Sequence, residues 1–106
     1  MCKSISEMNK ENAKYYGYEA QSNQLVEECA ELIQAVSKYR RAKATGVQPT
    51  LNLVFENLVE EIADVELMLE QVKYLLQIPE EDIQANKLYK VNRTKERIAK
   101  EVLKGE

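Results

Sequence analysis

The chain has 106 residues, 44% of them hydrophobic, and its 15 basic and 18 acidic residues leave a net charge of −3. This length suits one domain, and so mild a charge gives no reason to expect binding to nucleic acid or to an anionic membrane surface. Histidine is absent, which excludes Ser-His-Asp and Cys-His catalysis and any His-ligated zinc or iron site.

The composition favours an all-α fold, because the chain has only three glycines and two prolines and lacks tryptophan. No apolar run approaches the roughly 18 residues that a membrane helix needs. The N-terminal "MCKSISEMNK" lacks the apolar core of a signal peptide. Cys2 and Cys29 form no disulfide framework. We therefore expect a cytoplasmic protein with reduced thiols and no membrane contact.

The first part of the chain predicts a short helix followed by a long one. Residues 4–16 are weakly periodic, and Gly17 breaks this pattern. A long helix is predicted over about 19–43. The segment "ATGVQPT" (44–50) follows it and reads as a loop because of its glycine and proline.

A second long helix and a third are predicted in the remainder. The second covers about 51–77, with Thr50 or Asn52 as its N-cap. Pro79 suits the first turn of a third helix over about 80–103, and the acids after it suit the positive end of that helix.

Apolar residues line one stripe on each long helix, at about 100° per residue. The predicted core stripe of the first helix consists of Leu25, Cys29, Leu32, Val36 and Tyr39. That of the second helix consists of Leu58, Ile62, Val65, Leu69, Val72 and Leu76.

An acidic pair at i, i+3 spacing borders each predicted core stripe. The pairs are Glu28 with Glu31 and Glu61 with Asp64. The short loop predicts antiparallel helices, so we expect the pairs to face each other. Four carboxylates in one partly buried cleft raise one another's pKa or require a cation. Ligands that are all oxygen suit Mg²⁺ or Mn²⁺.

A plain alternative is that these acids only solvate the bundle, since acid pairs at this spacing are common on exposed helices. Glu27 and Glu60 lie further round on the polar side of each helix. We expect both to be solvated, or to contact a residue that binds the metal without binding it themselves.

The third helix carries the opposite charge. Lys90, Arg93 and Arg97 share one face, and Lys87 lies close to Lys90 on the same side. Such a face is suited to hold phosphates. The alternative is a solvated face whose charges pair with acids of the same helix.

The segment "YYGYEAQ" (15–21) is a candidate for binding a nucleobase. Tyr18 can stack on a base and Gln21 can read its edge, while Gln24 on the same stripe extends the site toward a nucleotide. Packing of the tyrosines in a core or interface is the alternative.

Two short motifs resemble those of a known family. "EECAE" (27–31) and "EIAD" (61–64) are similar to the EExxE…ExxD signature of the MazG-like all-α nucleoside triphosphate pyrophosphohydrolases. These are related to dimeric dUTPases, dCTP pyrophosphatases and phosphoribosyl-ATP pyrophosphohydrolase. "YGYEAQ" and "KVNRTKERI" also look like the short MazG-like proteins of bacteria and their phages.

The resemblance covers about residues 15–98. It implies one domain over residues 1–106: a helical bundle with two long antiparallel helices that carry the acidic pairs and a third, basic helix. It also implies assembly as a homodimer or homotetramer that partly shares its cleft between subunits.

The activity implied is Mg²⁺-dependent cleavage between the α and β phosphates of a nucleoside triphosphate, giving a monophosphate and pyrophosphate. Carried over residue by residue, the implied metal ligands are Glu28, Glu31, Glu61 and Asp64. Glu31 is also the candidate general base for a water activated by the ion. Lys90 and Arg93 are the implied phosphate-binding residues, with Lys87 and Arg97 as further candidates.

This sequence departs from the family at the base site, because relatives that pack the base with an N-terminal His or Trp have no counterpart here. Two other functions compete with the enzyme: a nucleotide-binding sensor or antitoxin-like partner without turnover, and a helical interaction protein. A di-iron bundle is excluded because it needs Glu-x-x-His pairs.

Overall fold

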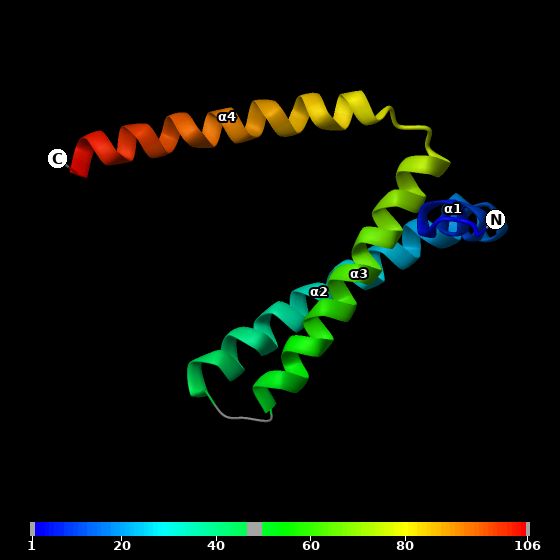
Figure 1. Cartoon of the computed structure of the whole chain (residues 1–106), viewed down its shortest axis with the longest axis horizontal. Helices are drawn as coiled ribbons and strands as arrows, with labels where there is room; N and C mark the ends of the chain where they lie inside the picture. Colours follow the sequence, from blue (N-terminus) through cyan, green and yellow to red (C-terminus); the bar gives the residue numbers. More distant parts are fainter. Residues whose placement is uncertain (1, 47–49, 106) are drawn as a thin grey trace. The chain divides into compact units, whose positions relative to one another are not determined.

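A computed structural model describes residues 2–46 and 50–105, which form four α-helices and no strand (Figure 1). The predicted all-α class is therefore confirmed. The chain divides into two compact units, Met1–Leu76 and Gln77–Glu106, and each is described by itself. That residues 1–106 act as one domain stays a prediction.

Helix α1 (Ile5–Tyr16) begins at an N-cap serine and ends at a glycine. Ser4 Oγ accepts a hydrogen bond from the Glu7 amide at 3.0 Å, which satisfies one of the free donors of the first turn. Gly17 has φ 85°, a conformation that favours glycine, and its amide donates to the Ala13 carbonyl at 2.8 Å. The break predicted at Gly17 is thus a single-residue corner between α1 and α2.

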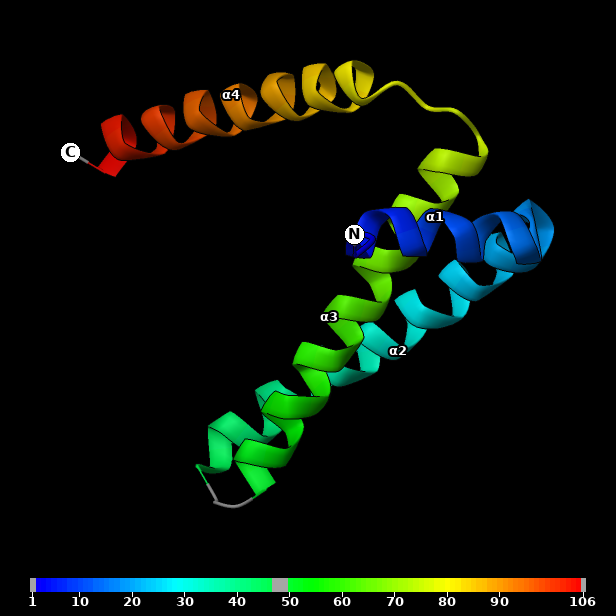
Figure 2. The same cartoon turned by 45° about the vertical axis from the view of Figure 1, so that its right-hand side comes forward.

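Helices α2 (Tyr18–Thr45) and α3 (Thr50–Leu75) lie side by side and run in opposite directions (Figures 1 and 2). Gly46 ends α2 in the left-handed conformation, and its amide donates to the Ala42 carbonyl at 2.9 Å. Of the predicted loop 44–50, residues 47–49 lie outside the described residues. Asn52 lies inside α3, so its prediction as N-cap is wrong.

Helix α1 packs on α3 and α2 through side-chain amides as well as apolar contacts. We call Asn9, Gln21 and Gln71 the amide layer; all three are buried. Gln21 Nε2 donates to Gln71 Oε1 at 2.7 Å, and Gln71 Nε2 donates to Asn9 Oδ1 at 2.7 Å. Asn9 Nδ2 donates to the Leu67 carbonyl and to Glu70 Oε1, each at 2.9 Å.

The predicted core stripes are wrong in part: Val65 is buried as predicted, whereas Val36, Ile62, Leu69 and Leu76 are exposed. The buried residues of the α2–α3 contact are Ala35, Ala42, Val65 and Met68, together with Gln21 and Gln71. On α2 the buried residues Gln21, Ala35 and Ala42 lie at heptad spacing with Glu28, on the stripe that carries the acidic pair. Alanine side chains let two helices approach closely, so this stripe, and not the bulkier apolar one beside it, faces α3.

Exposed apolar residues beside the buried stripes form a surface that we call the apolar face. Its members are Ile33, Val36, Phe55, Ile62, Leu69 and Leu76, all of them exposed. On both helices these residues lie about a quarter to a half turn round from the buried stripe, in the same rotational sense. For antiparallel neighbours this places both rows on one side of the pair.

Helix α4 (Glu80–Gly105) forms the second unit, and none of its residues is buried. It begins directly after Pro79, whose carbonyl accepts the Asp82 amide at 3.1 Å, and acids occupy its first turn as predicted. Within the described residues no helix is both long and apolar enough to cross a membrane.

Candidate metal centre

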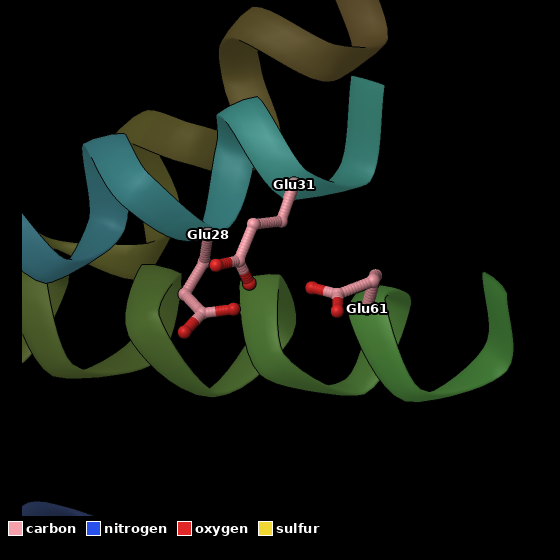
Figure 3. Close-up of side chains that lie close together, drawn as sticks. All are labelled: Glu28, Glu31 and Glu61. Carbon is pink, nitrogen blue, oxygen red and sulfur yellow. The ribbon is translucent and has the colours of Figure 1, made fainter. Parts of the chain in front are cut away.

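Antiparallel packing of α2 and α3 brings three of the four predicted acids together. Glu28 and Glu31 extend from α2 toward α3, and Glu61 extends back toward them (Figure 3). Each offers one carboxylate oxygen, and these three oxygens all lie within 4.8 Å of one another. We call these residues the acid cluster. That the two acidic pairs face each other is thereby confirmed for three members.

Asp64 borders the acid cluster through Glu28. Burial, then the negative charge of Glu28 and a proton shared with it, raise the pKa of Asp64 above its ordinary value of 3.8. Asp64 is not one of the three residues whose oxygens meet within 4.8 Å among the described residues. It therefore lies next to the cluster, one turn along α3 from Glu61.

The electrostatics of the cluster are unfavourable in the protein alone. Burial raises the pKa of Glu61 above its ordinary value of 4.5, and the charges of Glu31, Glu28 and Asp64 raise it further, as does a proton shared with Glu31. Like-charged carboxylates that share a site either hold a proton or attract a cation.

Two oxygens of the cluster are left without hydrogen bonds. In the described part of the chain, Glu28 Oε2 and Glu61 Oε2 are the buried side-chain atoms that find no hydrogen-bond partner. A buried acceptor without a donor is costly and is rare in folded proteins. A group made only of carboxylate oxygens is of the kind that hard cations such as Mg²⁺ bind.

Glu27 and Glu60 are exposed, in agreement with the prediction that both are solvated. Their position beside Glu28 and Glu61 in the sequence makes them natural controls. Each has the charge of its neighbour but lies outside the acid cluster.

The three residues predicted to bind a nucleoside lie along the first two turns of α2. Tyr18 opens the helix and is exposed. Gln21 is buried and its amide donates to Gln71, whereas Gln24 Nε2 donates to Glu28 Oε1 at 2.7 Å. Their predicted contact with a nucleotide stays a prediction.

Sequence reasoning missed Asn9 and Gln71 of the amide layer. Gln71 follows Glu61, Asp64 and Met68 at spacings of three and four residues. This spacing puts Gln71 on the same face of α3 as the acidic pair, which is the signal that could have identified it. Asn9 carries no comparable signal, because α1 has weak periodicity in the sequence.

The predicted phosphate-binding residues all lie on α4 and are exposed: Lys87, Lys90, Arg93 and Arg97. The Arg93 guanidinium carbon lies 5.7 Å from the centroid of the Tyr89 ring. These residues belong to the second unit, and their action on a ligand of the acid cluster stays a prediction.

Comparisons of the chain with protein-family models, with curated proteins and with solved structures found no match.

Proposed function

We propose that the protein is a MazG-like nucleoside triphosphate pyrophosphohydrolase that uses Mg²⁺ and releases a nucleoside monophosphate and pyrophosphate. The observation that carries this proposal is the pair of buried, unpartnered oxygens, Glu28 Oε2 and Glu61 Oε2, inside a cluster of carboxylates. A solvated acidic surface leaves such oxygens in water, whereas a cation site keeps them dry and free to bind. The EExxE…ExxD spacing adds the chemistry that the geometry alone does not specify.

Each acid has a defined part in this proposal. Glu28, Glu31, Glu61 and Asp64 hold the cation. When bound, Mg²⁺ supplies positive charge that offsets the charge on the phosphates and makes a water more acidic. Glu31 is the exposed member of the acid cluster, so it is the carboxylate best placed to take a proton from the attacking water.

The basic residues of α4 bind the phosphates in this proposal. Arg93 and Lys90 contact the triphosphate, with Lys87 and Arg97 beside them. Between Lys87 and Lys104 basic residues outnumber acidic ones, although the chain as a whole is acidic. Charge-assisted hydrogen bonds from such residues are the usual way to hold phosphates.

The decisive experiment is a substrate panel. The protein is incubated with Mg²⁺ and ribo- and deoxynucleoside triphosphates, and monophosphate and pyrophosphate are quantified. Glu28→Gln is expected to lose more than about 100-fold in kcat/KM, beyond the usual cost of removing a residue that only supports a ligand. Glu27→Gln is the matched control and is expected to keep its activity.

Three outcomes contradict parts of the proposal. Absence of turnover on every triphosphate, with Mg²⁺ or Mn²⁺, rejects the enzyme. Tight, metal-dependent nucleotide binding without product assigns the chain to the nucleotide-binding modules instead. Full activity of Glu28→Gln rejects the metal ligands while leaving the reaction in place.

The proposal includes a homodimer or homotetramer, and the apolar face is the surface that supports it. Ile62 and Leu69 of α3, and Leu76 directly after its end, are each 42–48% exposed at heptad spacing, the spacing of residues that pack against a further helix. Leu69→Lys is expected to lower the mass measured by light scattering, and Glu66→Lys is the control on an exposed polar position of α3. A monomeric native protein contradicts this part.

A further inference from the structure

We propose that Gln24 is a positioning residue for the metal site, which fixes the carboxylate of Glu28 so that one of its oxygens is kept for the cation. The inference rests on the proposed function for the identity of the ligand, Mg²⁺ or Mn²⁺. It goes beyond that function by giving Gln24 a role on the protein side of the site, in place of the nucleotide contact that the sequence suggests.

The contact between the two side chains is short and partly buried. Gln24 Nε2 lies 2.7 Å from Glu28 Oε1, and both residues are half-buried. They are separated by four residues on α2, the spacing at which helical side chains lie one above the other. The donor is a neutral amide, so it holds the carboxylate without the positive charge that would compete with a metal ion.

The two oxygens of Glu28 therefore have different environments. Oε1 accepts the Gln24 amide, whereas Oε2 is buried and has no hydrogen-bond partner. A hydrogen bond to one oxygen restricts the rotation of the carboxylate. Its second oxygen is then held buried and without a hydrogen bond, beside Glu31 and Glu61, whose charges repel it.

This arrangement explains how a repulsive cluster stays assembled before a cation binds. Without the tether, Glu28 is free to turn away from Glu31 and Glu61, whose like charges repel it. Bonds from neighbouring side chains to metal ligands commonly serve this purpose, and their loss weakens metal binding by about 10–100-fold.

The test compares Gln24→Met with Gln34→Met. Methionine keeps the length and helix propensity of glutamine but has no N–H donor, and Gln34 is an exposed glutamine of the same helix. Binding of Mn²⁺ alone, without nucleotide, is measured by electron paramagnetic resonance. We expect a Kd about 10-fold or more higher for Gln24→Met, the lower end of the effect of such supporting bonds, and an unchanged Kd for Gln34→Met.

Steady-state kinetics separate positioning from substrate contact. For Gln24→Met, a higher Mg²⁺ requirement with an unchanged KM for the triphosphate at saturating Mg²⁺ supports the proposal. A raised KM for the triphosphate with normal Mn²⁺ affinity overturns it and restores Gln24 to the nucleotide.

A measurement on the native side chain does not depend on how Gln24→Met folds. The side-chain amide signals of Gln24 in a ¹⁵N–¹H spectrum are expected to shift in metal-free Glu28→Met, which removes the acceptor, and to stay in place in Glu27→Met. Signals that do not move in Glu28→Met overturn the proposal.

Failure of this inference and failure of the proposed function are distinguishable. Turnover by the native protein with an unaltered Mn²⁺ Kd in Gln24→Met rejects the role of Gln24 alone. Weakened Mn²⁺ binding in Gln24→Met, in a protein that turns over no nucleotide, rejects the enzyme and keeps the positioning role.

Discussion

Two polar layers lie along the packing of α2 on α3, and they differ in how their polar groups are satisfied. In the amide layer, Gln21, Gln71 and Asn9 donate and accept in sequence, so each buried amide has a partner within the chain. In the acid cluster, Glu28 and Glu61 each bury an oxygen that has none. The hydrogen bonds of the first layer are made within the chain, whereas the second layer leaves two buried oxygens without a partner among the described residues.

The carboxylates of the two regions show the same contrast. Glu70 accepts hydrogen bonds from Asn9 and Ser6, each at 2.9 Å, and these bonds lower its pKa below the ordinary value of 4.5. The pKa of Glu61 is raised, first by burial and then by its acidic neighbours. A carboxylate among hydrogen-bond donors stabilises the fold, whereas a carboxylate among other carboxylates destabilises it when no cation is bound.

The largest expected effect comes from breaking the amide layer. Asn9→Ala removes two donated bonds and one accepted bond, and it leaves Gln71 Nε2 without its acceptor and Glu70 Oε1 without its donor. We expect a loss of about 2–4 kcal/mol of unfolding free energy, because each buried group left without a partner costs about 1–3 kcal/mol. Urea denaturation of the native protein and of Asn9→Ala measures this difference in unfolding free energy.

The control for this prediction is Asn12→Ala, an exposed asparagine of the same helix, which carries the same change in helix propensity. Equal losses in the two variants contradict a special role for the amide layer. The Mn²⁺ affinity of Asn9→Ala, measured below its melting temperature, is expected to match that of the native protein.

A smaller effect of opposite sign is expected in the acid cluster. Burial and the charge of Glu28 raise the pKa of Asp64, which means that the folded protein disfavours its charged form. Asp64→Asn removes this charge, so the metal-free protein is expected to become more stable. Glu60→Gln, at an exposed position of α3, is expected to change little. A clear loss of stability in metal-free Asp64→Asn contradicts a repulsive cluster.

The smallest expected effect is the pH dependence of the stability of the metal-free protein. Because the folded-state pKa values of Glu61 and Asp64 lie above 4.5 and 3.8, metal-free stability is expected to rise as pH falls from neutral through those raised values. Glu70 acts in the opposite direction: its contribution is present above its unfolded value of 4.5 and is lost as pH falls through the lowered folded value. Thermal melts between neutral and acidic pH therefore pass through a maximum, and a monotonic fall from pH 7 contradicts the account.

The sequence predicts the helices and the acid pairs better than it predicts the rotation of each helix. Periodicity identifies which residues share a face, and so it placed Glu28, Glu31 and Glu61 on facing stripes. It does not identify which neighbour covers that face. Val36 and Ile62 read as core, but in this chain they belong to the apolar face.

The amide layer was beyond sequence reasoning for a different reason. Buried amides are stable only when their partners are in place, and those partners come from three helices. Asn9 and Gln71 are 62 residues apart in the chain, so no local pattern pairs them. The tether from Gln24 to Glu28 is local, and its i, i+4 spacing is visible in the sequence once Glu28 is taken as a ligand.

The most direct test of the central claim is thermal unfolding of the native protein and of Glu61→Gln, each with and without Mg²⁺. We predict that Mg²⁺ raises the melting temperature of the native protein, because a ligand that binds only the folded state stabilises it. Glu61→Gln is predicted to melt higher than the native protein without metal and to gain nothing from Mg²⁺. A native melting temperature that ignores Mg²⁺, or a Glu61→Gln variant that keeps the full shift, contradicts a cation site at the acid cluster.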